Sequence, residues 1–159
     1  MTAEKIKSLP EVLELVLNWQ AAGDEVVFTN GCFDILHLGH IDYLEKARAL
    51  GNRLVLGLNT DASVQRLKGP HRPVVNQDAR ARLMAALCFV DTVILFDEQT
   101  PQALIEALKP DILVKGDDYR PETIVGADFV LNRGGRVETI PLIDGYSTTR
   151  LIQKIKESF

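Results

Sequence analysis

The sequence predicts an α/β domain built on a parallel sheet, and three observations lead to that prediction. Short apolar runs rich in Val, Ile and Leu recur along the chain, at 25–28, 53–59, 92–96, 111–115 and 136–141. Segments with helical spacing of apolar residues separate these runs, and Gly, Pro or a capping hydroxyl marks most boundaries. Strands that alternate with helices pair in parallel through right-handed crossovers. We therefore expect a five-stranded parallel sheet flanked by helices.

Bulk properties narrow the class of protein. At 159 residues the chain fits one domain with a sizeable core, and its 46% apolar and 25% charged residues are ordinary for a globular protein. The net charge is −4 with acids and bases interspersed, so no basic stripe suits nucleic acid or a membrane surface. The N-terminus lacks a signal peptide's apolar core. We expect a cytoplasmic protein that binds neither nucleic acid nor membrane, with Cys32 and Cys88 reduced.

The N-terminal part is expected to form a helical extension, residues 1–24, ahead of a main domain over 25–159. Within the extension, residues 10–20 read as a helix, because Pro10 suits a first helical turn and Gly23 a stop. Its apolar positions are more numerous than one narrow stripe requires. We therefore expect the helix to pack on the sheet or against a second subunit, which makes a homodimer or higher homo-oligomer our expectation.

Helices are expected after each of the first strands. Residues 41–51 have apolar positions at helical spacing and end in glycine, and 60–68 form a shorter helix behind a capping residue. Residues 69–73, with two prolines and a glycine, give the strongest loop signal of the chain. Helical spacing then returns over 76–87 and leads to the third strand.

The C-terminal part repeats the alternation. A threonine and a proline at 100–101 begin a helix, and the fourth strand runs into a turn at 116–118. A short helix and the Gly-Gly turn at 134–135 precede the fifth strand. The hydroxyl residues at 147–149 then cap a last helix that continues through Lys156.

One stretch, residues 29–40, organises the rest, because it connects the first strand to the helix behind it. Ligands of open parallel sheets bind at the carboxyl ends of strands. His37 and His40 open the helix with Gly39 between them, where free N–H groups and the helix dipole favour an anion. The two histidines could instead be core residues or metal ligands, but no third ligand follows at the spacing of a zinc site. We expect them to bind phosphate.

Several cations follow at strand or helix ends. Lys68, Arg72 and Arg80 read individually as solvated surface charges, and Lys115, beside the 116–118 turn, does so as well. A triphosphate, however, needs several cations converging on it. The hydroxyls at 147–149 are explained equally well as an ordinary helix cap or as a second anion site. Two candidate anion-binding helix starts in one small domain are more informative than either alone.

The order of these pieces resembles a known family. A strand, a Gly-x-Phe-Asp turn and His-x-Gly-His resemble the nucleotidyltransferase superfamily, which includes cytidylyltransferases and class I aminoacyl-tRNA synthetases. From about 26 to 156 the chain is similar, more narrowly, to the adenylyltransferase domain of the bacterial heptose kinase/adenylyltransferases. The matching pieces are 29–37, 39–40, 66–69, 72–74, Arg80, 90–91, 100–101, 110–116, 118–119 and 147–149.

The resemblance implies a single Rossmann-like domain and a reaction. AMP would pass from ATP to D-glycero-β-D-manno-heptose 1-phosphate, which gives ADP-heptose and pyrophosphate for the inner core of lipopolysaccharide. Mg²⁺ would accompany ATP, and no protein metal site is implied. Asp117 stands where the family has glycine and Tyr146 where it has cysteine. Because no kinase segment is seen, we expect a free-standing version of the domain that works with a separate kinase.

The resemblance also implies residue roles. The expected catalytic residues are His37, His40, Lys68 and Arg80. The expected nucleotide-binding residues are Asn30, Gly31, Phe33, Gly39, Gly116, Asp118, Ser147, Thr148 and Thr149. The expected contacts to the sugar phosphate are Asp34, Lys68, Arg72 and Lys115.

Three alternative functions stay open at the level of sequence. The chain could be a cytidylyltransferase or guanylyltransferase for another small phosphate such as glycerol 3-phosphate. It could be a non-catalytic nucleotide-binding module, although a mere binder has no need of both histidines and Lys68. A tRNA-handling fragment is disfavoured by the acidic balance and the short chain.

Overall fold

The computed structural model describes all 159 residues and contains one five-stranded parallel sheet, which confirms the expected fold class. The strands lie in the order β3-β2-β1-β4-β5, so the chain builds outward in one direction from β1 and then in the other. The strands are β1 (Val26–Gly31), β2 (Arg53–Asn59), β3 (Thr92–Phe96), β4 (Ile112–Gly116) and β5 (Arg136–Ile140).

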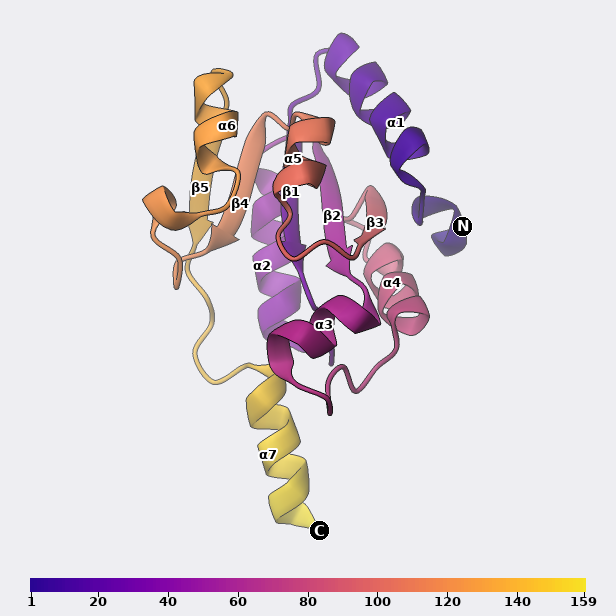
Figure 1. Ribbon diagram of the computed structural model, residues 1–159, viewed down its shortest axis with the longest axis vertical. Helices are drawn as coiled ribbons and strands as arrows, with labels where there is room; N and C mark the ends of the chain where they lie inside the picture. Colours follow the sequence, from indigo (N-terminus) through magenta and orange to yellow (C-terminus); the bar gives the residue numbers. More distant parts are fainter.

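Helices connect the strands as expected, and one short 3₁₀ helix precedes them all (Figure 1). The helices are η1 (Thr2–Lys5), α1 (Leu9–Ala21), α2 (Leu38–Ala49), α3 (Asp61–Lys68), α4 (Gln77–Ala86), α5 (Gln102–Leu108), η2 (Pro121–Thr123), α6 (Ala127–Asn132) and α7 (Thr148–Ser158). None of them is both long enough and apolar enough to cross a membrane.

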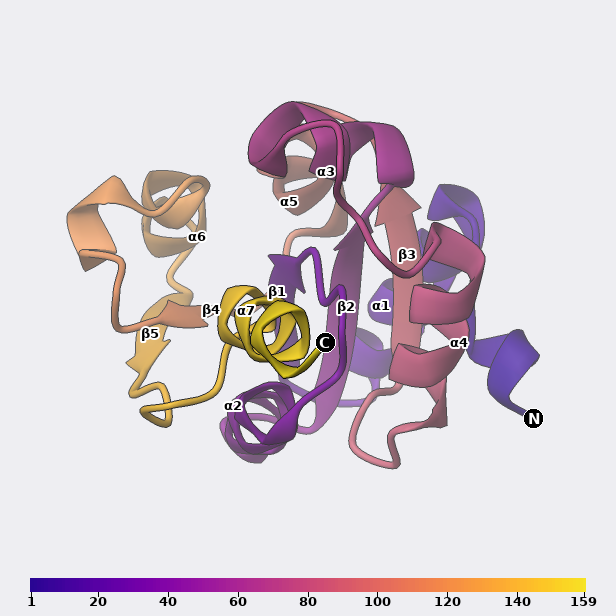
Figure 2. The same ribbon diagram turned by 90° about the horizontal axis from the view of Figure 1, so that it is seen from below.

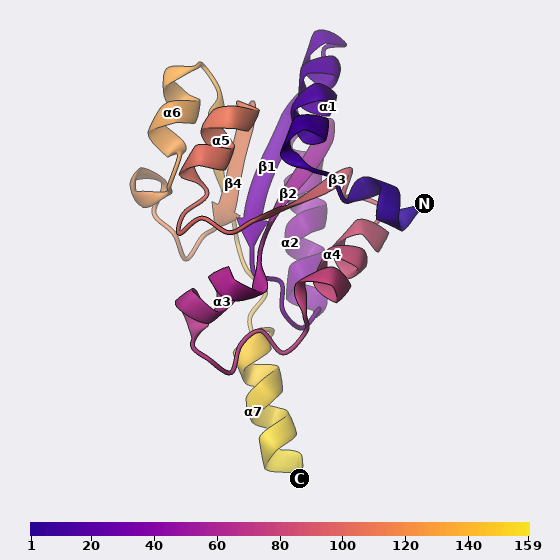
Figure 3. The same ribbon diagram turned by 45° about the vertical axis from the view of Figure 1, so that its right-hand side comes forward.

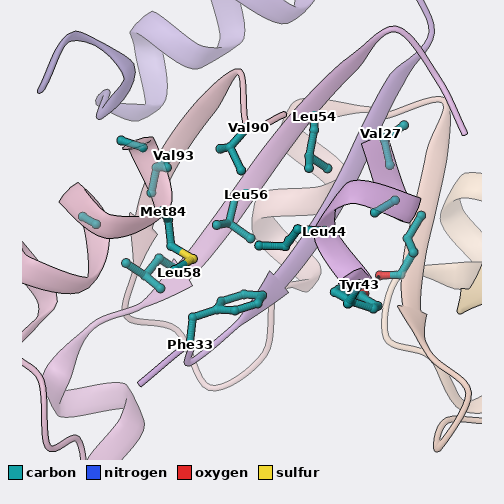
Figure 4. Close-up of a cluster of buried hydrophobic side chains, with 14 of the residues drawn as sticks. Val27, Phe33, Tyr43, Leu44, Leu54, Leu56, Leu58, Met84, Val90 and Val93 are labelled. Atoms are coloured by element: carbon teal, nitrogen blue, oxygen red, sulfur yellow. Dashed lines mark hydrogen bonds between the residues drawn. The ribbon is translucent and has the colours of Figure 1, made fainter. Parts of the chain in front are cut away.

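Two apolar layers cover the two faces of the sheet. Alternation along β2 shows why, since Leu54, Leu56 and Leu58 enter one cluster with α2 and α4, whereas Val55 enters the other with α1, α5 and α6. In the end-on view α2 and α5 lie on opposite faces of the sheet (Figure 2). Each buried leucine stabilises the fold by about 1.5–3 kcal/mol relative to an exposed one. Phe33 lies at one end of the first cluster (Figure 4).

The α1 helix belongs to this packing. Ser8 and Glu11 form a capping box at its start, and Val12 and Val16 are fully buried in the cluster that also contains Val26. The amide of Gln20 donates hydrogen bonds to the chain at the start of β4. Of the two packing partners expected for α1, the sheet is therefore the one observed within the chain.

The chain ahead of α1 also joins the sheet. Ile6 forms a parallel bridge with Val93, and the Lys7 N–H donates to the Val93 carbonyl over 3.0 Å. Lys5 donates to the carbonyl of Val90 over 2.7 Å. Residues 5–7 therefore lie along the outer side of β3, which is the edge strand on that side.

The order of the strands places a crevice between β1 and β4. From β1 the chain turns toward β2 and β3 and later returns to place β4 on the other side of β1, which makes this pair the topological switch point. At the carboxyl ends of these strands lie α3 and the start of α7, while the rest of α7 extends away from the body (Figures 1 and 3). A ligand is expected to bind here.

Candidate active site

A cleft of about 600 Å³ opens at the carboxyl ends of β1 and β4, within the range of small-ligand sites. Its walls include the turn after β1, the end of α3 with the loop behind it, the end of β4, and the start of α7. The predicted site residues that line it are Asn30, Gly31, Phe33, Asp34, His37, Gly39, His40, Lys68, Arg72, Lys115, Gly116, Asp118, Ser147, Thr148 and Thr149. Arg80 is absent from the lining.

The two histidines stack on one another at the start of α2. His37 is the N-cap with extended backbone, and its ring centroid lies 3.7 Å from that of His40. The Phe33 ring meets His40 edge-on at 5.1 Å between centroids. Both Nδ1 atoms are buried and have no hydrogen-bond partner. Because unpaired buried polar atoms cost free energy, this arrangement suits a ligand that supplies the partner.

The environment keeps both imidazoles neutral in the free chain. Burial lowers the pKa of His37, and burial together with the neighbouring His37 lowers the pKa of His40 to about 4, against a smaller opposing effect of Asp34. A bound anion would favour the protonated form of either ring. While the cleft is empty, the two neutral rings therefore do not repel each other. When a phosphate binds, the rings can donate hydrogen bonds to it.

Glycines bring the backbone close to these rings. A Cβ on Gly39 would lie 3.0 Å from the His37 ring and 3.2 Å from Tyr146 Cβ, and one on Gly31 would lie 2.8 Å from the Phe33 ring. Phe33 itself has a positive φ of 44°, which is uncommon for a bulky residue. Its ring is almost fully buried, so packing offsets the backbone cost.

Three cations face the cleft from two sides. Lys68 is exposed at the end of α3 and forms no ion pair, and Arg72 leaves both Nη atoms without a protein acceptor. On the opposite side, Lys115 Nζ donates to the Asn30 carbonyl over 3.2 Å and lies 5.4 Å from the centroid of the Tyr119 ring. Burial lowers the pKa of Lys115 to about 8, despite the nearby carboxylate of Asp118.

Two predicted site residues have their polar atoms engaged by the protein itself. Arg80 is fully buried and absent from the cleft lining, and its guanidinium donates to three backbone carbonyls and to Asp61. Asp34 lines the cleft, and its carboxylate accepts from the N–H groups of Val74 and Val75 and from Arg72 Nε. Both residues connect segments of the chain next to the cleft through these hydrogen bonds.

The start of α7 closes another side. Ser147 caps the helix by accepting from the Arg150 N–H over 3.1 Å, which is the structural role expected of such a residue. Thr148 is buried, and its hydroxyl lies 3.5 Å from the Ile35 carbonyl. Thr149 is exposed and unpaired, so it can donate to a ligand.

The end of β4 leaves little room. A Cβ on Gly116 would lie 2.6 Å from Asp118 Oδ1, so only glycine fits this position without a shift. Asp118 accepts no hydrogen bond and lines the cleft, whereas Asp117 is outside the lining and binds the backbone of Ile140 and Leu142. Of the two departures from the family pattern, only Tyr146 lines the cleft.

Part of the cleft lining is formed by residues that had no predicted site role. Tyr119, Val125 and Leu142 form an apolar portion beside Gly116, and residues 99–101 approach from the loop before α5. Val125 and Leu142 belong to connections without a motif, so only the folded chain brings them to the cleft. An apolar wall of this kind suits the flat face of a nucleobase.

Comparisons with known proteins agree with this geometry. The family model described as cytidylyltransferase-like matches residues 28–154. The chain belongs to the cytidylyltransferase-like family. The resemblance to nucleotidyltransferases found in the sequence is thereby confirmed, and the matched region contains every predicted site residue.

Among curated relatives of this family, the bifunctional protein HldE of Trichlorobacter lovleyi is 57% identical over 155 residues, which are 98% of this chain and 32% of that protein. HldE of Magnetococcus marinus is 56% identical over 153 residues, 96% of this chain and 31% of that protein. The chain thus spans about a third of the length of these relatives.

Two solved structures of other proteins share this fold. The lipopolysaccharide core biosynthesis protein of Thermoplasma volcanium is 32% identical with a TM-score of 0.61, covering 79% of this chain and 100% of that one. Pantoate-beta-alanine ligase of Francisella tularensis, solved with β,γ-ATP and β-alanine, is 14% identical with a TM-score of 0.60, covering 95% of this chain and 76% of that one. The second likeness shows the fold alone.

Proposed function

We propose that the chain transfers AMP from ATP to D-glycero-β-D-manno-heptose 1-phosphate and releases pyrophosphate. The observation that carries the proposal is the set of uncommitted donors around one cleft at the switch point of the sheet. Two buried imidazole nitrogens have no partner, Lys68 forms no ion pair, and Arg72 binds Asp34 through Nε, which leaves its two Nη atoms without an acceptor. A cleft of this charge suits two phosphate-bearing substrates.

The expected mechanism is a direct displacement at the α-phosphorus of ATP. An oxygen of the sugar phosphate attacks, the bond to the pyrophosphate oxygen breaks, and no covalent enzyme intermediate forms. The residues act by positioning two anions and by stabilising the charge that develops between them. His37 and His40 would donate to the nucleotide phosphates, while Lys68, Arg72 and Lys115 would hold the sugar phosphate and the transferring group.

A Mg²⁺ ion that arrives with ATP fits the residues present. Of the two carboxylates that line the cleft, Asp34 is fully engaged by four hydrogen bonds and only Asp118 is unpaired. The ion would therefore take most of its ligands from phosphate oxygens and water, as Mg²⁺ commonly does. When bound, it would neutralise charge on the phosphates; positioning would remain the work of the histidines and lysines.

The heptose assignment rests on likeness to other proteins. The pieces that match heptose adenylyltransferases run from the first strand to the last helix, and a relative with 32% identity is described as a lipopolysaccharide core biosynthesis protein. Within the same cleft, a different base or a different small phosphate would use the same phosphate contacts. The choice of substrates is therefore the point for experiment.

Pyrophosphate release with Mg²⁺ and heptose 1-phosphate, measured in parallel with ATP, GTP, CTP and UTP, tests the proposal. We expect turnover with ATP and little with the other three. A preference for CTP or GTP would move the chain to a sister activity with the same mechanism. Silence with every nucleotide and with other sugar and glycerol phosphates, in a folded chain that still binds ATP, would favour a binding module instead.

A further inference from the structure

Arg80 is the largest of the fully buried side chains, although arginine is rarely buried without compensation. It lies on α4, outside the cleft, and its charge is met by four hydrogen bonds. Nε donates to the Val75 carbonyl over 2.9 Å, and Nη2 donates to Asp61 Oδ1 over 2.7 Å. Nη1 donates to the carbonyls of Cys32 over 2.7 Å and Asn59 over 2.9 Å.

The four acceptors lie at the two ends of one segment and on the turn beside it. Asn59 ends β2 and Asp61 begins α3, while Val75 closes the loop that follows α3. A single guanidinium therefore holds both ends of segment 59–75. Its bond to Cys32 fixes that segment to the turn after β1, which continues into the histidine pair.

Asp34 fastens the same segment from the other side. Its carboxylate accepts from the N–H groups of Val74 and Val75 at 2.8–2.9 Å and from Arg72 Nε at 2.6 Å. Burial would raise the pKa of Asp34, but the two N–H groups and the guanidinium of Arg72 outweigh it and hold this pKa below its usual value. Val75 is thus held at its N–H by Asp34 and at its carbonyl by Arg80.

Segment 59–75 carries Lys68 and Arg72, two of the cations that face the cleft. We propose that Arg80 is a positioning residue that sets where these two cations stand relative to the bound phosphates. Four of its five N–H groups are engaged by the protein, so it acts through the segment and not on the substrate. The effect on catalysis rests on the proposed function, whereas the effect on the segment does not.

The fork of arginine explains why another cation would not serve. Carbonyls from three elements and one carboxylate are reached by nitrogens fixed in one plane, and a lysine ammonium has a single centre on a flexible stem. Arg80→Lys keeps the charge and most of the volume but cannot reach all four acceptors. We therefore expect Arg80→Lys to fold with segment 59–75 loosened.

The first readout uses no substrate. Hydrogen exchange of the full chain should show the amides of Arg72, Val74 and Val75 exchanging about tenfold faster or more in Arg80→Lys, with β1 and β2 unchanged. Arg82→Lys is the matched control, since Arg82 lies on the same helix and donates to Thr2 Oγ1 far from the cleft. It should leave both exchange and activity as they are. Unchanged exchange in Arg80→Lys would overturn the proposal.

The second readout is a double-mutant comparison. In the wild type, Arg80→Lys should lower kcat/KM for the sugar phosphate about a hundredfold, the loss that follows a misplacement of about 1 Å. In a background with Lys68→Ala and Arg72→Ala, the same change should cost less than about threefold, because the groups it positions are gone. A full hundredfold loss in that background would assign Arg80 a direct role and overturn positioning.

Asp61→Asn keeps the inference testable if Arg80→Lys does not fold. The Asp61 side chain is partly exposed, and its loss leaves the three carbonyl contacts of Arg80 in place. It should loosen the start of α3 and move exchange in 60–68 in the same direction but less. No change in exchange there would count against Arg80 as the fastening of this segment, whatever the nucleotide assay of the wild type shows.

Discussion

Two groups of polar side chains lie around the turn after β1, and they differ in how their polar atoms are paired. In the first group, Asp34 and Arg80 have nearly all their polar atoms paired, with eight hydrogen bonds to the surrounding chain. In the second, His37 and His40 stack with both Nδ1 atoms buried and unpaired. The protein itself supplies hydrogen-bond partners for the first group, whereas the two Nδ1 atoms of the second group have none.

The difference separates structure from function more sharply than residue type does. A paired buried charge is costly to disturb because its partners would be left unsatisfied, so it is tied to the fold. An unpaired buried polar atom weakens the fold until a ligand supplies its partner. From sequence, all four residues were candidates for contact with substrate. The structure divides them into two whose polar atoms are engaged by the protein and two with an unpaired ring nitrogen.

The largest expected effect belongs to the unpaired group. His40→Ala should lower kcat by about 10²–10³-fold, the value of one donor to a developing oxyanion, or roughly 2.7–4 kcal/mol. Its free energy of unfolding should change by less than about 1 kcal/mol, because no hydrogen bond is lost. Steady-state kinetics and urea unfolding measure the two. His71→Ala, an exposed histidine outside the cleft, is the control. Near-normal turnover in folded His40→Ala would remove the histidine from the mechanism.

A second prediction separates the two groups by pH. The folded-state pKa of His40 is about 4, below its usual 6.5, so between these values the unfolded chain binds more protons. The free energy of unfolding should therefore fall by up to about 3 kcal/mol as pH drops from 6.5 to 4, with His37 adding in the same direction. The pKa of Asp34 is also lowered, so its contribution is present above the ordinary carboxyl pKa and is lost only below it.

Urea unfolding of the wild type, His40→Ala and Asp34→Asn across this range tests the separation. His40→Ala should flatten the decline between pH 6.5 and 4, and Asp34→Asn should leave that decline but flatten the one below about pH 4. A wild-type stability that does not change between pH 6.5 and 4 would mean that the imidazoles are not held neutral by burial.

The smallest effect is expected at Gly39, which lets the histidine pair form. The new Cβ of Gly39→Ala would crowd the His37 ring at 3.0 Å and Tyr146 at 3.2 Å, and the ring must shift by a few tenths of an ångström. We expect kcat/KM to fall about tenfold, while the helix gains up to about 1 kcal/mol from alanine. Activity that stays normal beside a stability gain would show that the ring position tolerates this shift.

Most of the fold could be predicted from the sequence, because hydrophobic runs, caps and turn residues agree at nearly every boundary. One strand was predicted too short. Residues 29–31 look like a turn, yet they pair with β2, and the Thr29 hydroxyl is satisfied by Tyr43 and by the Val114 carbonyl. Those partners come from elements far along the chain, so local sequence gave no sign of them. The order of the strands likewise depends on packing.

The site was harder to predict for the same reason. The position of the histidine motif could be predicted because the strand, the turn and the helix that form it follow one another directly in the sequence. In sequence, Arg80 looks like the exposed Arg82. Arg80 can be buried because its guanidinium binds several carbonyls, and two of these belong to Cys32 and Asn59, which lie much earlier in the chain. Nothing in local sequence distinguishes an arginine that binds carbonyls from one that binds phosphate.

The way the sheet ends has a consequence for solubility. An outer strand offers unpaired backbone groups to any other strand, which is a common start of aggregation. On the β3 side, Ile6 and Lys7 occupy part of that row with backbone of their own. On the β5 side no further strand pairs with this row, and the short edge strand carries the charged pair Arg136 and Glu138. Backbone from the N-terminal residues thus covers part of the β3 edge, and charged side chains oppose the addition of another strand at the β5 edge.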